Sequence, residues 1–494
     1  MSETMNYNPS LYEINIRAFL KRFGEDAALE NIPDDYWMEL RSKGIDYVWL
    51  MGVWKTCEEN VDKYCFEDYL IKSYDKALSD WRRRDVIGSP FAIDKYEVNP
   101  RLGTEESLLK LKNLLNDIGI KLILDFVPNH FGADTSLLRD APDIFLKVDE
   151  SNYLKDPHTF FKPFEDRDEY YAHGRDPFFP AWQDTIQVNL MSRKARGYYI
   201  DILGKMTRLC DGIRCDMAML AMNNVFKNTW AGVYNNAEDE GPVVEFWEEI
   251  IGSVRSVRND FIFIAEAYWD LEWKLQQQGF DYTYDKKLTD RITAGYVRDI
   301  HDHLMAEESY QKKSVRFIEN HDEERSVTLL GKEKALAAAV IISTIQGMRF
   351  YFDGQFEGKK IKLPVQLGRE PAEPVNKEIK NFYDKLLSIV SSDVLKKGKW
   401  TLLEPAPAWD GNSTYLNMLA WEWTHQHKNC LVVINFSDKT SSCRIKLDLR
   451  DYDEEILLND LLNDKVYRRS SEEIIMQGLY IELKPYASHI FMWE

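Results

Sequence analysis

The chain has 494 residues and a formal net charge of −19 at pH 7, from 82 acidic and 63 basic side chains. This acidic excess argues against a polyanionic partner such as nucleic acid, whereas a neutral ligand is indifferent to it. A hydrophobic content of 44% and a charged content of 29% are ordinary for a globular protein. The length predicts roughly two to four folding units with ample core.

The cysteines and the lengths of the apolar runs indicate the cellular compartment of the protein. No run of about 18 apolar residues occurs, which predicts no membrane span and no membrane partner. The first ten residues, MSETMNYNPS, lack the basic head and apolar stretch of a secretion signal. Six cysteines without metal-ligand spacing fit reduced thiols in a cytoplasmic protein better than a disulfide framework. These are Cys57, Cys65, Cys210, Cys215, Cys430 and Cys443.

Apolar runs typical of buried strands alternate with helix-like segments over the first two thirds of the chain. Most runs are continuously apolar, as parallel strands covered on both faces require. The predicted strands are residues 11–19, 45–50, 121–126, 211–216, 261–266, 280–285, 315–320 and 348–352.

The clearest helix is predicted over residues 104–118. Thr104 can cap its first turn, and Gly119 ends it just before the third strand begins. Leucines and an isoleucine at helical spacing give it one apolar stripe. Eight strands alternating with helices predict an α/β fold, a closed (β/α)8 TIM barrel.

Two connections are too long for a simple barrel, and the end of the chain has a different texture. Residues 51–94 carry a charged, aromatic insertion, and residues 131–186 form an irregular insertion after the third strand. Short alternating runs at 430–437, 443–449, 478–484 and 487–493 predict a C-terminal antiparallel β-sandwich. The expected domains are a catalytic barrel (1–130 and 187–390), an inserted irregular domain (131–186) and the sandwich (391–494).

The fourth strand carries Arg214 and Asp216, two residues apart and therefore on one face. A neighbouring cation keeps a carboxylate ionised, as a nucleophile must be. Taken alone, such a pair is more often an ordinary surface ion pair.

Other strand ends add acids at the same rim, where barrel active sites lie. Asp125 and His130 follow the third strand, and Glu266 ends the fifth. His321 and Asp322 follow the seventh. Each acid alone could be a cap or a solvated loop residue. Carboxylates gathered on one rim repel one another, which favours a functional role over a structural one.

Clustered carboxylates suit glycoside chemistry, in which one attacks the anomeric carbon and another donates a proton to the leaving oxygen. The competing use is a divalent metal centre. No HExxH, no histidine pair at helical spacing and no DxD occurs at these rims, so glycoside chemistry is preferred.

Several motifs then resemble the α-amylase family, glycoside hydrolase family 13, in order along nearly the whole chain. DFVPNH, GIRCDMA, FIAEAY and FIENHDEER are similar to the family's motifs at the third, fourth, fifth and seventh strands. QVNL, at 187–190, is similar to the motif near the end of its second domain. The segment 89–104 is similar to the approach to its third helix.

The resemblance implies a retaining mechanism and a role for each matching residue. It implies Asp216 as nucleophile, Glu266 as general acid/base and Asp322 as transition-state stabiliser. Among the binding residues, it implies that Arg214 holds the nucleophile ionised, that Asp125 is structural, and that two histidines bond sugar hydroxyls, His130 and His321. It also implies the three-part architecture, which the residue patterns predict independently.

Departures from the family pattern narrow this expectation. Where many starch-degrading members have Lys-His after the nucleophile, this chain has Met219 and Leu220. Typical endo-amylase action and the usual calcium site are therefore in doubt. Asn129 matches only one calcium ligand, and no metal and no cofactor are predicted. Phe91 is the best match to the aromatic that stacks on the reacting sugar, with a core residue beside a proline turn as the alternative.

Four more aromatics lie near the same rim and are candidates to stack on sugars, with ordinary packing as the alternative for each: Trp54, Trp182, Tyr268 and Trp269. Cys215 is expected to pack between barrel and helices.

The sequence thus predicts a retaining glycosidase or transglycosylase acting on a neutral α-linked oligosaccharide or α-glucan fragment. A sugar phosphorylase and a non-catalytic carbohydrate-binding or scaffold protein are the alternatives. The sequence leaves the substrate, the choice between hydrolysis and transfer, and the oligomeric state open.

Overall fold

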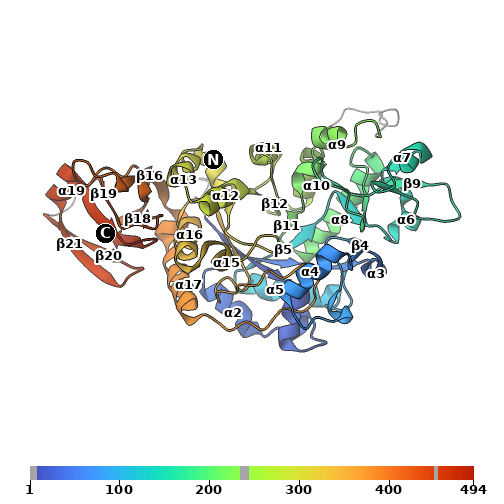
Figure 1. The fold of residues 1–494 in the computed structure, drawn as a ribbon, viewed down its shortest axis with the longest axis horizontal. Helices are drawn as coiled ribbons and strands as arrows, with labels where there is room; N and C mark the ends of the chain where they lie inside the picture. The colour runs from blue at the N-terminus through green and yellow to red at the C-terminus, as the bar shows by residue number, and fades with distance from the viewer. Residues whose placement is uncertain (1–7, 234–243, 450–453) are drawn as a thin grey trace.

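The computed structural model describes residues 8–233, 244–449 and 454–494. Its centre is a closed barrel of parallel strands, ordered β1-β15-β14-β13-β12-β11-β5-β2 around the circle (Figure 1). The strands are β1 (Ser10–Asn15), β2 (Tyr47–Met51), β5 (Lys121–Phe126), β11 (Gly212–Cys215), β12 (Ile262–Ala265), β13 (Tyr282–Tyr284), β14 (Ser314–Arg316) and β15 (Met348–Phe352). Each predicted strand corresponds to one of these, and the barrel fold is confirmed.

Helices surround the barrel and follow its strands. The main ones are α2 (Asp34–Ser42), α5 (Glu105–Asp117), α8 (Arg193–Leu209), α10 (Phe246–Val257), α12 (Lys286–Ala294), α13 (Val297–Leu304), α16 (Lys332–Thr344) and α17 (Lys377–Val390). Shorter ones are α1 (Ile16–Phe19), α9 (Asn223–Thr229), α11 (Glu272–Gln277), α14 (Glu308–Lys312), α15 (Ser326–Leu330) and α18 (Asp393–Lys397). Helix α5 confirms the predicted cap, because Oγ1 of Thr104 accepts the Ser107 N–H at 3.2 Å.

Some strand ends differ from the prediction. The first apolar run continues to residue 19, but the strand ends at Asn15 and the run continues as helix α1, whose residues are all buried. An apolar run marks burial and does not by itself distinguish a strand from a helical turn. Strand β14 ends at Arg316, and the residues after it form the loop that carries His321 and Asp322.

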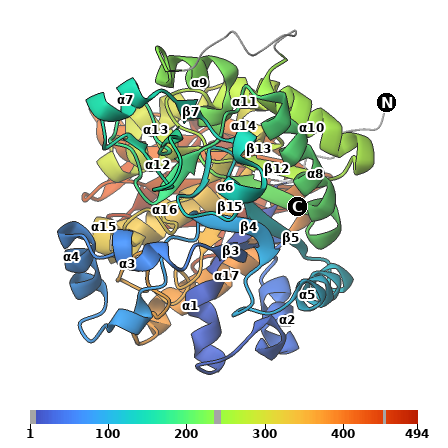
Figure 2. The same cartoon turned by 90° about the vertical axis from the view of Figure 1, so that its right-hand side faces the viewer.

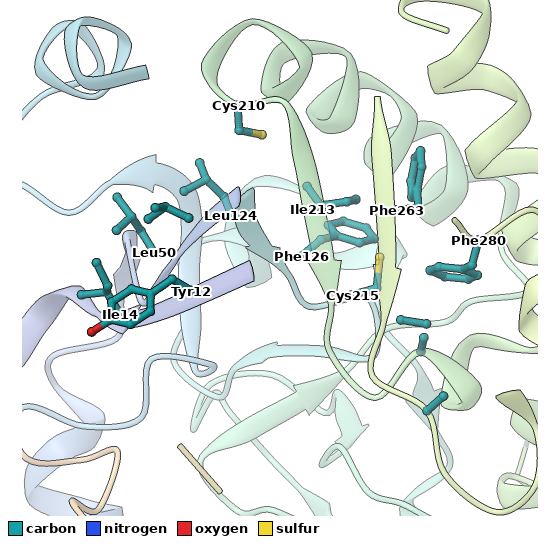
Figure 3. Close-up of a cluster of buried hydrophobic side chains, with 14 of the residues drawn as sticks. Tyr12, Ile14, Leu50, Leu124, Phe126, Cys210, Ile213, Cys215, Phe263 and Phe280 are labelled. Atoms are coloured by element: carbon teal, nitrogen blue, oxygen red, sulfur yellow. The ribbon is translucent and has the colours of Figure 1, made fainter. Parts of the chain in front are cut away.

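Strand β11 separates two parts of the core. Ile213 and Cys215 pack outward, in the cluster that also holds Phe126 and Phe263 (Figure 3). This confirms the expected packing role of Cys215. Arg214 lies on the opposite face of the strand, toward the barrel interior. At the start of the strand, a Cβ on Gly212 would lie 2.6 Å from the Ile262 carbonyl oxygen, so only glycine permits this close strand pairing.

The two long connections form small structures beside the barrel. The first contains β3 (Trp54–Thr56), α3 (Asn60–Tyr64), α4 (Asp68–Ala77) and β4 (Ile93–Val98). The second contains β6 (His130–Gly132), α6 (Leu137–Asp140), β7 (Lys147–Val148), α7 (Glu150–Lys155), β8 (Phe160–Phe161), β9 (Tyr170–Ala172) and β10 (Thr185–Gln187). Figure 2 shows α6, α7 and β7 of this second connection toward the viewer, in front of the barrel strands.

The C-terminal part consists of an antiparallel six-stranded sheet, ordered β16-β17-β18-β23-β20-β21, and the two-stranded sheet β19-β22. Its elements are β16 (Lys399–Leu403), β17 (Met418–His425), β18 (Lys428–Asn435), β19 (Ser441–Ile445), β20 (Glu455–Asp460), β21 (Lys465–Ser470), α19 (Ser471–Gln477), β22 (Leu479–Leu483) and β23 (Ser488–Trp493). One apolar cluster fills the space between the two sheets. The predicted C-terminal β-domain is confirmed.

The C-terminal sheet is fastened to the barrel. The buried indole of Trp423 on β17 donates to the Thr344 carbonyl, at the end of α16, at 2.6 Å. Trp421 and Val432 join the same hydrophobic cluster as the barrel helices. The barrel and the sheet therefore share one continuous core.

Candidate active site

The carboxyl ends of neighbouring barrel strands bring together side chains that are far apart in the chain. Arg214 on β11 is paired in register with Asp125 on β5 and with Ile264 on β12. Asp216 follows β11 directly, and Glu266 follows β12 directly. Parallel strands in this register place their C-terminal residues at one rim, which is where the sequence predicts the site.

Arg214 is the centre of the cluster. Its Nη1 donates to Oδ1 of Asp216 at 2.9 Å, and its Nη2 lies 2.7 Å from Oε2 of Glu266. Nη1 also lies 4.0 Å from Oδ1 of Asp125. The predicted pair is therefore a buried cation shared by several carboxylates, and the alternative of a surface ion pair is wrong.

Aromatic rings enclose the guanidinium of Arg214. Its central carbon lies 4.9 Å from the ring centre of Trp49, 5.4 Å from that of Phe91 and 5.8 Å from that of Tyr284. Ring faces attract a cation and exclude water from it. Charges in this cluster consequently interact more strongly than they would in water.

The two carboxyls on Arg214 have perturbed acidities. Burial raises the pKa of Asp216, and the charge of Arg214 opposes that shift. Burial also raises the pKa of Glu266, again opposed by Arg214, while the nearby charge of Asp216 adds to the rise. Two neighbouring carboxyls that disfavour simultaneous ionisation suit a pair in which one is charged and the other holds a proton.

Glu266 is held by two further donors. The Met217 N–H donates to Oε2 at 2.7 Å, and the Tyr268 hydroxyl donates to Oε1 at 2.8 Å. Met217 has φ 41°, a left-handed conformation that is unusual for this residue type and that is typical of strained functional sites. This turn directs the backbone next to Asp216 onto Glu266.

His321 links two carboxylates at the other side of the cluster. Its Nδ1 lies 2.5 Å from Oε1 of Glu13, and its Nε2 lies 3.0 Å from Oδ2 of Asp322. Burial acts to lower the pKa of His321, but the charges of Asp322 and Glu13 outweigh it and raise the pKa well above its usual range. The ring is therefore an imidazolium between two acids.

Asp322 differs from the other acids of the rim, because its side chain is 49% exposed. Its partial burial acts to raise its pKa, but the charge of His321, assisted by Arg214, lowers the pKa to about 2. The Lys362 ammonium also donates to the Asp322 carbonyl oxygen. Asp322 is thus an ionised carboxylate facing the open side of the rim.

Asp125 lies inside the barrel and fastens its neighbours. Its carboxylate accepts the Trp49 indole N–H at 3.0 Å and the Gly52 N–H at 2.9 Å. Burial raises its pKa to about 7, against the charge of Arg214. These contacts give it a structural place beside the cluster.

His130 and Phe91 complete the set of predicted side chains. Burial lowers the pKa of His130 to about 3, so its ring is neutral, and the ring centre lies 5.4 Å from that of Trp182. The partly buried ring of Phe91 lies 5.5 Å from that of His321. Phe91 therefore borders the carboxylate cluster and also packs against the hydrophobic core, so both interpretations stay open.

The other rim aromatics divide into core and surface. Trp54 is buried and donates its indole N–H to the Asp125 carbonyl at 2.7 Å, so it packs in the core. Trp269 is 36% exposed and makes an edge contact with Phe178 of the second connection. Met219 and Leu220, in the short helix η5 (Ala218–Ala221), are buried apolar residues.

The sequence does not predict the contacts that two further residues make with the site. Glu13 lies in the first strand, 308 positions from His321, and reads there as one polar residue in an apolar run. The sequence predicts Tyr268 as a ring that stacks on sugar or packs, and in the structure its hydroxyl donates a hydrogen bond to Glu266. Only its spacing, two residues from Glu266, could have indicated a shared face.

The family's usual calcium site does not fit these residues. The Gln187 amide nitrogen donates to the carbonyl oxygen of Asn129 at 2.8 Å and to its side-chain oxygen at 3.0 Å. An N–H group directed at both oxygens competes with a hard cation for them. In the part of the chain that the structure describes, no group of three or more His, Cys, Asp or Glu is arranged to hold a metal ion.

A closed (β/α)8 barrel with acids gathered at its carboxyl rim is the arrangement of barrel enzymes. The chain belongs to the alpha-amylase family: the family described as "Alpha amylase, catalytic domain" matches residues 39–393. Within the described residues, no helix combines the length and the apolar character that crossing a bilayer requires.

Named relatives agree with this assignment. The chain is 25% identical over 379 residues to "Alpha-amylase 2" of Dictyoglomus thermophilum, covering 72% of this chain and 60% of that protein. It is 22% identical over 424 residues to "Maltogenic alpha-amylase" of Bacillus acidopullulyticus, covering 79% and 63%. The chain thus spans about three fifths of the length of these relatives.

Solved structures share the fold over the whole chain. A maltogenic alpha-amylase of Thermotoga neapolitana, described as noncanonic, has a TM-score of 0.70 at 20% identity, covering 98% of both chains. An alpha-amylase of Geobacillus thermoleovorans complexed with acarbose has a TM-score of 0.66 at 17% identity, covering 100% of this chain and 99% of that one.

Proposed function

We propose that this chain is a retaining glycosidase or transglycosylase that cleaves α-glucosidic bonds through a covalent glycosyl-enzyme. The observation that carries the proposal is the buried guanidinium of Arg214, which contacts Asp216 and Glu266 through its two terminal nitrogens. A carboxyl pair held adjacent in this way supports a retaining mechanism, which needs a separation of about 5 Å. Membership of the alpha-amylase family supports it independently.

In the first half-reaction, the Asp216 carboxylate attacks the anomeric carbon while Glu266 gives its proton to the leaving glycosidic oxygen. Arg214 favours the charged form of Asp216. The buried setting of Glu266 favours its protonated form. Asp322, ionised and facing the open rim, stabilises the positive charge that develops on the sugar.

In the second half-reaction, Glu266 takes a proton from water or from a sugar hydroxyl. The resulting nucleophile attacks the anomeric carbon and releases the Asp216 carboxylate. Hydrolysis and transfer share every step except the identity of this acceptor. Met217 and Tyr268, which bond the two oxygens of Glu266, hold it in place for both proton transfers.

The proposed substrate is a neutral oligosaccharide or α-glucan fragment. Similarity to the family's motifs supports His130 and His321 as residues that bond hydroxyls of the reacting sugar, and Phe91, 5.5 Å from His321, as the ring that covers its face. The relative named maltogenic alpha-amylase supports short α-linked glucans as substrates. The net charge of −19 supports an uncharged partner over nucleic acid.

The test removes the nucleophile. We expect Asp216→Asn to lower turnover of maltotriose and cyclic maltodextrin about ten-thousandfold or more, because the amide cannot form the covalent intermediate. Product release is followed by chromatography, and proton NMR of fresh product should show the α-anomer first. Asp270→Asn is the matched control, since Asp270 is an exposed rim carboxylate that pairs with Lys287.

Unchanged turnover by Asp216→Asn would contradict the mechanism, provided that its thermal unfolding matches wild type. Release of a sugar phosphate that depends on added phosphate would identify a phosphorylase instead. Binding of the sugars without any turnover by wild type would identify a carbohydrate-binding protein.

The domain limits and the compartment remain proposals. We propose that the barrel spans residues 1–130 and 187–390, the insertion residues 131–186 and the β-domain residues 391–494. Support for the cytoplasm is that all six cysteines are buried free thiols.

A further inference from the structure

The loop between β15 and α17, residues 353–376, brings a lysine to the open side of the carboxylate rim. The ammonium of Lys362 donates to the backbone carbonyl oxygen of Asp322. Among the residues that the structure describes, this is its one hydrogen bond, and no carboxylate oxygen lies within 4.0 Å of it. An ammonium has three N–H groups, so two of them remain for a ligand.

The backbone beside Lys362 is fixed, unlike that of an ordinary solvated lysine. The Glu373 carboxylate accepts the Lys360 N–H at 2.7 Å and the Ile361 N–H at 3.4 Å. The Thr328 hydroxyl donates to the Lys360 carbonyl at 2.7 Å. A segment that is ordered before a ligand arrives loses less entropy when the ligand binds.

The two neighbours of Lys362 face away from the rim. Ile361 and Leu363 pack against the apolar cluster of the first insertion, which includes Tyr74. Lys362, between them, contacts Asp322 instead. The loop therefore directs its apolar side chains at the insertion and one charged side chain at the site.

The same loop also borders Phe91. The Ile87 N–H, four positions before Phe91, donates to the Gln366 carbonyl at 2.8 Å. Val365 and Phe91 both pack against the apolar cluster inside the barrel. In the proposed function, Phe91 covers the sugar whose bond is cleaved. The loop of Lys362 is therefore next to the sugar that is transferred.

The leaving group lies on a different side of the site. Glu266, which gives its proton to the leaving oxygen, is held by Met217 and Tyr268, and neither belongs to the loop of Lys362. Asp322 faces the reacting sugar in the proposed function, and Lys362 holds the backbone of Asp322. The free N–H groups of Lys362 consequently lie beyond the reacting sugar, on its non-reducing side.

We infer that Lys362 binds a second glucosyl unit, the one attached to the non-reducing side of the reacting sugar, by donating to its hydroxyl groups. This inference rests on the proposed function for its ligand class. The substrate is then an α-glucan fragment with at least two glucosyl units before the bond that is cleaved. Binding energy at the second unit lowers the barrier to reaction at the first.

Two chromogenic substrates with the same leaving group test this contact. 4-Nitrophenyl α-glucoside has one glucosyl unit before the cleaved bond, and 4-nitrophenyl α-maltoside has two. We expect Lys362→Met to lower kcat/KM for the maltoside about tenfold to a hundredfold, as for loss of a hydrogen bond to a charged group. For the glucoside, kcat/KM should fall less than about threefold, because the Asn320 side chain still accepts the Asp322 N–H at 2.9 Å. Release of nitrophenol is followed by absorbance.

Two further variants and a binding measurement accompany the test. Lys362→Arg keeps a cationic donor and should retain most of the preference for the maltoside. Lys360→Met is the matched control, because Lys360 is an exposed lysine of the same loop whose backbone contacts Glu373 and Thr328. In the Asp216→Asn chain, calorimetry with maltotriose should show about tenfold weaker binding when Lys362→Met is added.

An unchanged ratio of the two kcat/KM values in Lys362→Met would overturn the inference, whether both values fall together or neither changes. A larger loss for the glucoside than for the maltoside would overturn it as well. Thermal unfolding at the wild-type temperature shows that the variant is folded. Failure of the proposed function is distinct, since wild type then releases nitrophenol from neither substrate, and calorimetry of the Asp216→Asn chain still tests the contact.

Discussion

Glu13 and Asp322 are separated by most of the barrel sequence, yet one imidazole lies between them. The Glu13 carboxylate holds Nδ1 of His321, and Nε2 faces Asp322. Glu13 is fully buried, and its carboxylate contacts the site through this histidine. It is therefore a positioning residue, which keeps His321 charged and so keeps Asp322 ionised.

Replacing Glu13 by glutamine tests this role. Loss of its negative charge lowers the pKa of His321, so the ring loses its proton at a lower pH than in wild type. We expect kcat/KM of Glu13→Gln to fall about tenfold to a hundredfold at alkaline pH while remaining close to wild type in mild acid. The measurement is a pH profile of kcat/KM for maltotriose.

The free energy of unfolding should depend on pH in the same direction as kcat/KM. The pKa of His321 is raised in the folded state. The protonated His321 therefore contributes its full share to the free energy of unfolding below its unfolded-state pKa of about 6.5. That contribution is lost as the pH rises through the pKa of His321 in the folded state. Glu13→Gln should lose part of this stabilisation at neutral pH. Glu13→Asp is the control that keeps the charge, and a Gln variant whose profile runs parallel to wild type at every pH would contradict the role.

At the scale of residues, the sequence predicts contacts between side chains that are close together along the chain. Arg214 and Asp216 share a face because they are two residues apart on a strand, and the structure joins them. The contacts of Glu13 and Tyr268 cannot be predicted from the sequence. They depend on which strands are neighbours in the closed barrel and on the path of a loop. A glutamate in an apolar strand carries no local sign of its partner.

At the scale of elements, strand β11 shows why a short segment can be specified so closely. Its first residue, Gly212, lies against Ile262 on β12 and Ile123 on β5. The strand can then deliver Arg214 to the interior and Cys215 to the helices. Close approach of the neighbouring strands sets the position of Arg214 against both carboxyls.

A methyl group at this glycine should loosen the site. A Cβ at Gly212 would lie 2.6 Å from the Ile262 carbonyl oxygen and 2.9 Å from Cδ1 of Ile123. We expect Gly212→Ala to lower the free energy of unfolding by about 1–3 kcal/mol. Urea unfolding followed by circular dichroism measures the change.

Gly204→Ala on α8 is the matched control. No atom lies within 4 Å of a Cβ there, so alanine should raise the free energy of unfolding by up to about 1 kcal/mol through its higher helix propensity. If the two alanine variants change stability equally, strand packing at Gly212 is not the cause.

The sequence predicts the presence of each barrel strand more accurately than the residue at which the strand ends. The third and eighth barrel strands are found at their predicted residues, because turns flank both apolar runs. The first run overshoots into helix α1, since continuous burial hides the change of conformation. In the C-terminal domain, the predicted runs miss four strands, β16, β17, β20 and β21. In β21, exposed lysine and arginine side chains dilute the apolar signal.

At the scale of the whole molecule, the barrel and the C-terminal sheet share a core. Trp423 belongs to that shared cluster and bonds the end of helix α16. The amino-acid pattern predicts both units but not their contact, because an apolar residue on a strand shows that it is covered without showing by what.

Trp423→Ala should therefore destabilise both units together. We expect a loss of about 3–5 kcal/mol in a single cooperative transition, measured by differential scanning calorimetry. Trp409→Ala removes the same side chain from an exposed position of the same domain and should change stability by less than about 0.5 kcal/mol. Two separate transitions in the Trp423 variant would show that the domains unfold independently.

The rings around Arg214 have a consequence for the working conditions of the molecule. Dissolved salt screens charges over about 8–10 Å, but only where water and its ions can enter. Arg214 is buried and lies against Trp49, Phe91 and Tyr284. The attraction of Arg214 for Asp216 and Glu266 is therefore screened by dissolved salt much less than the charge of the half-exposed Asp322 is.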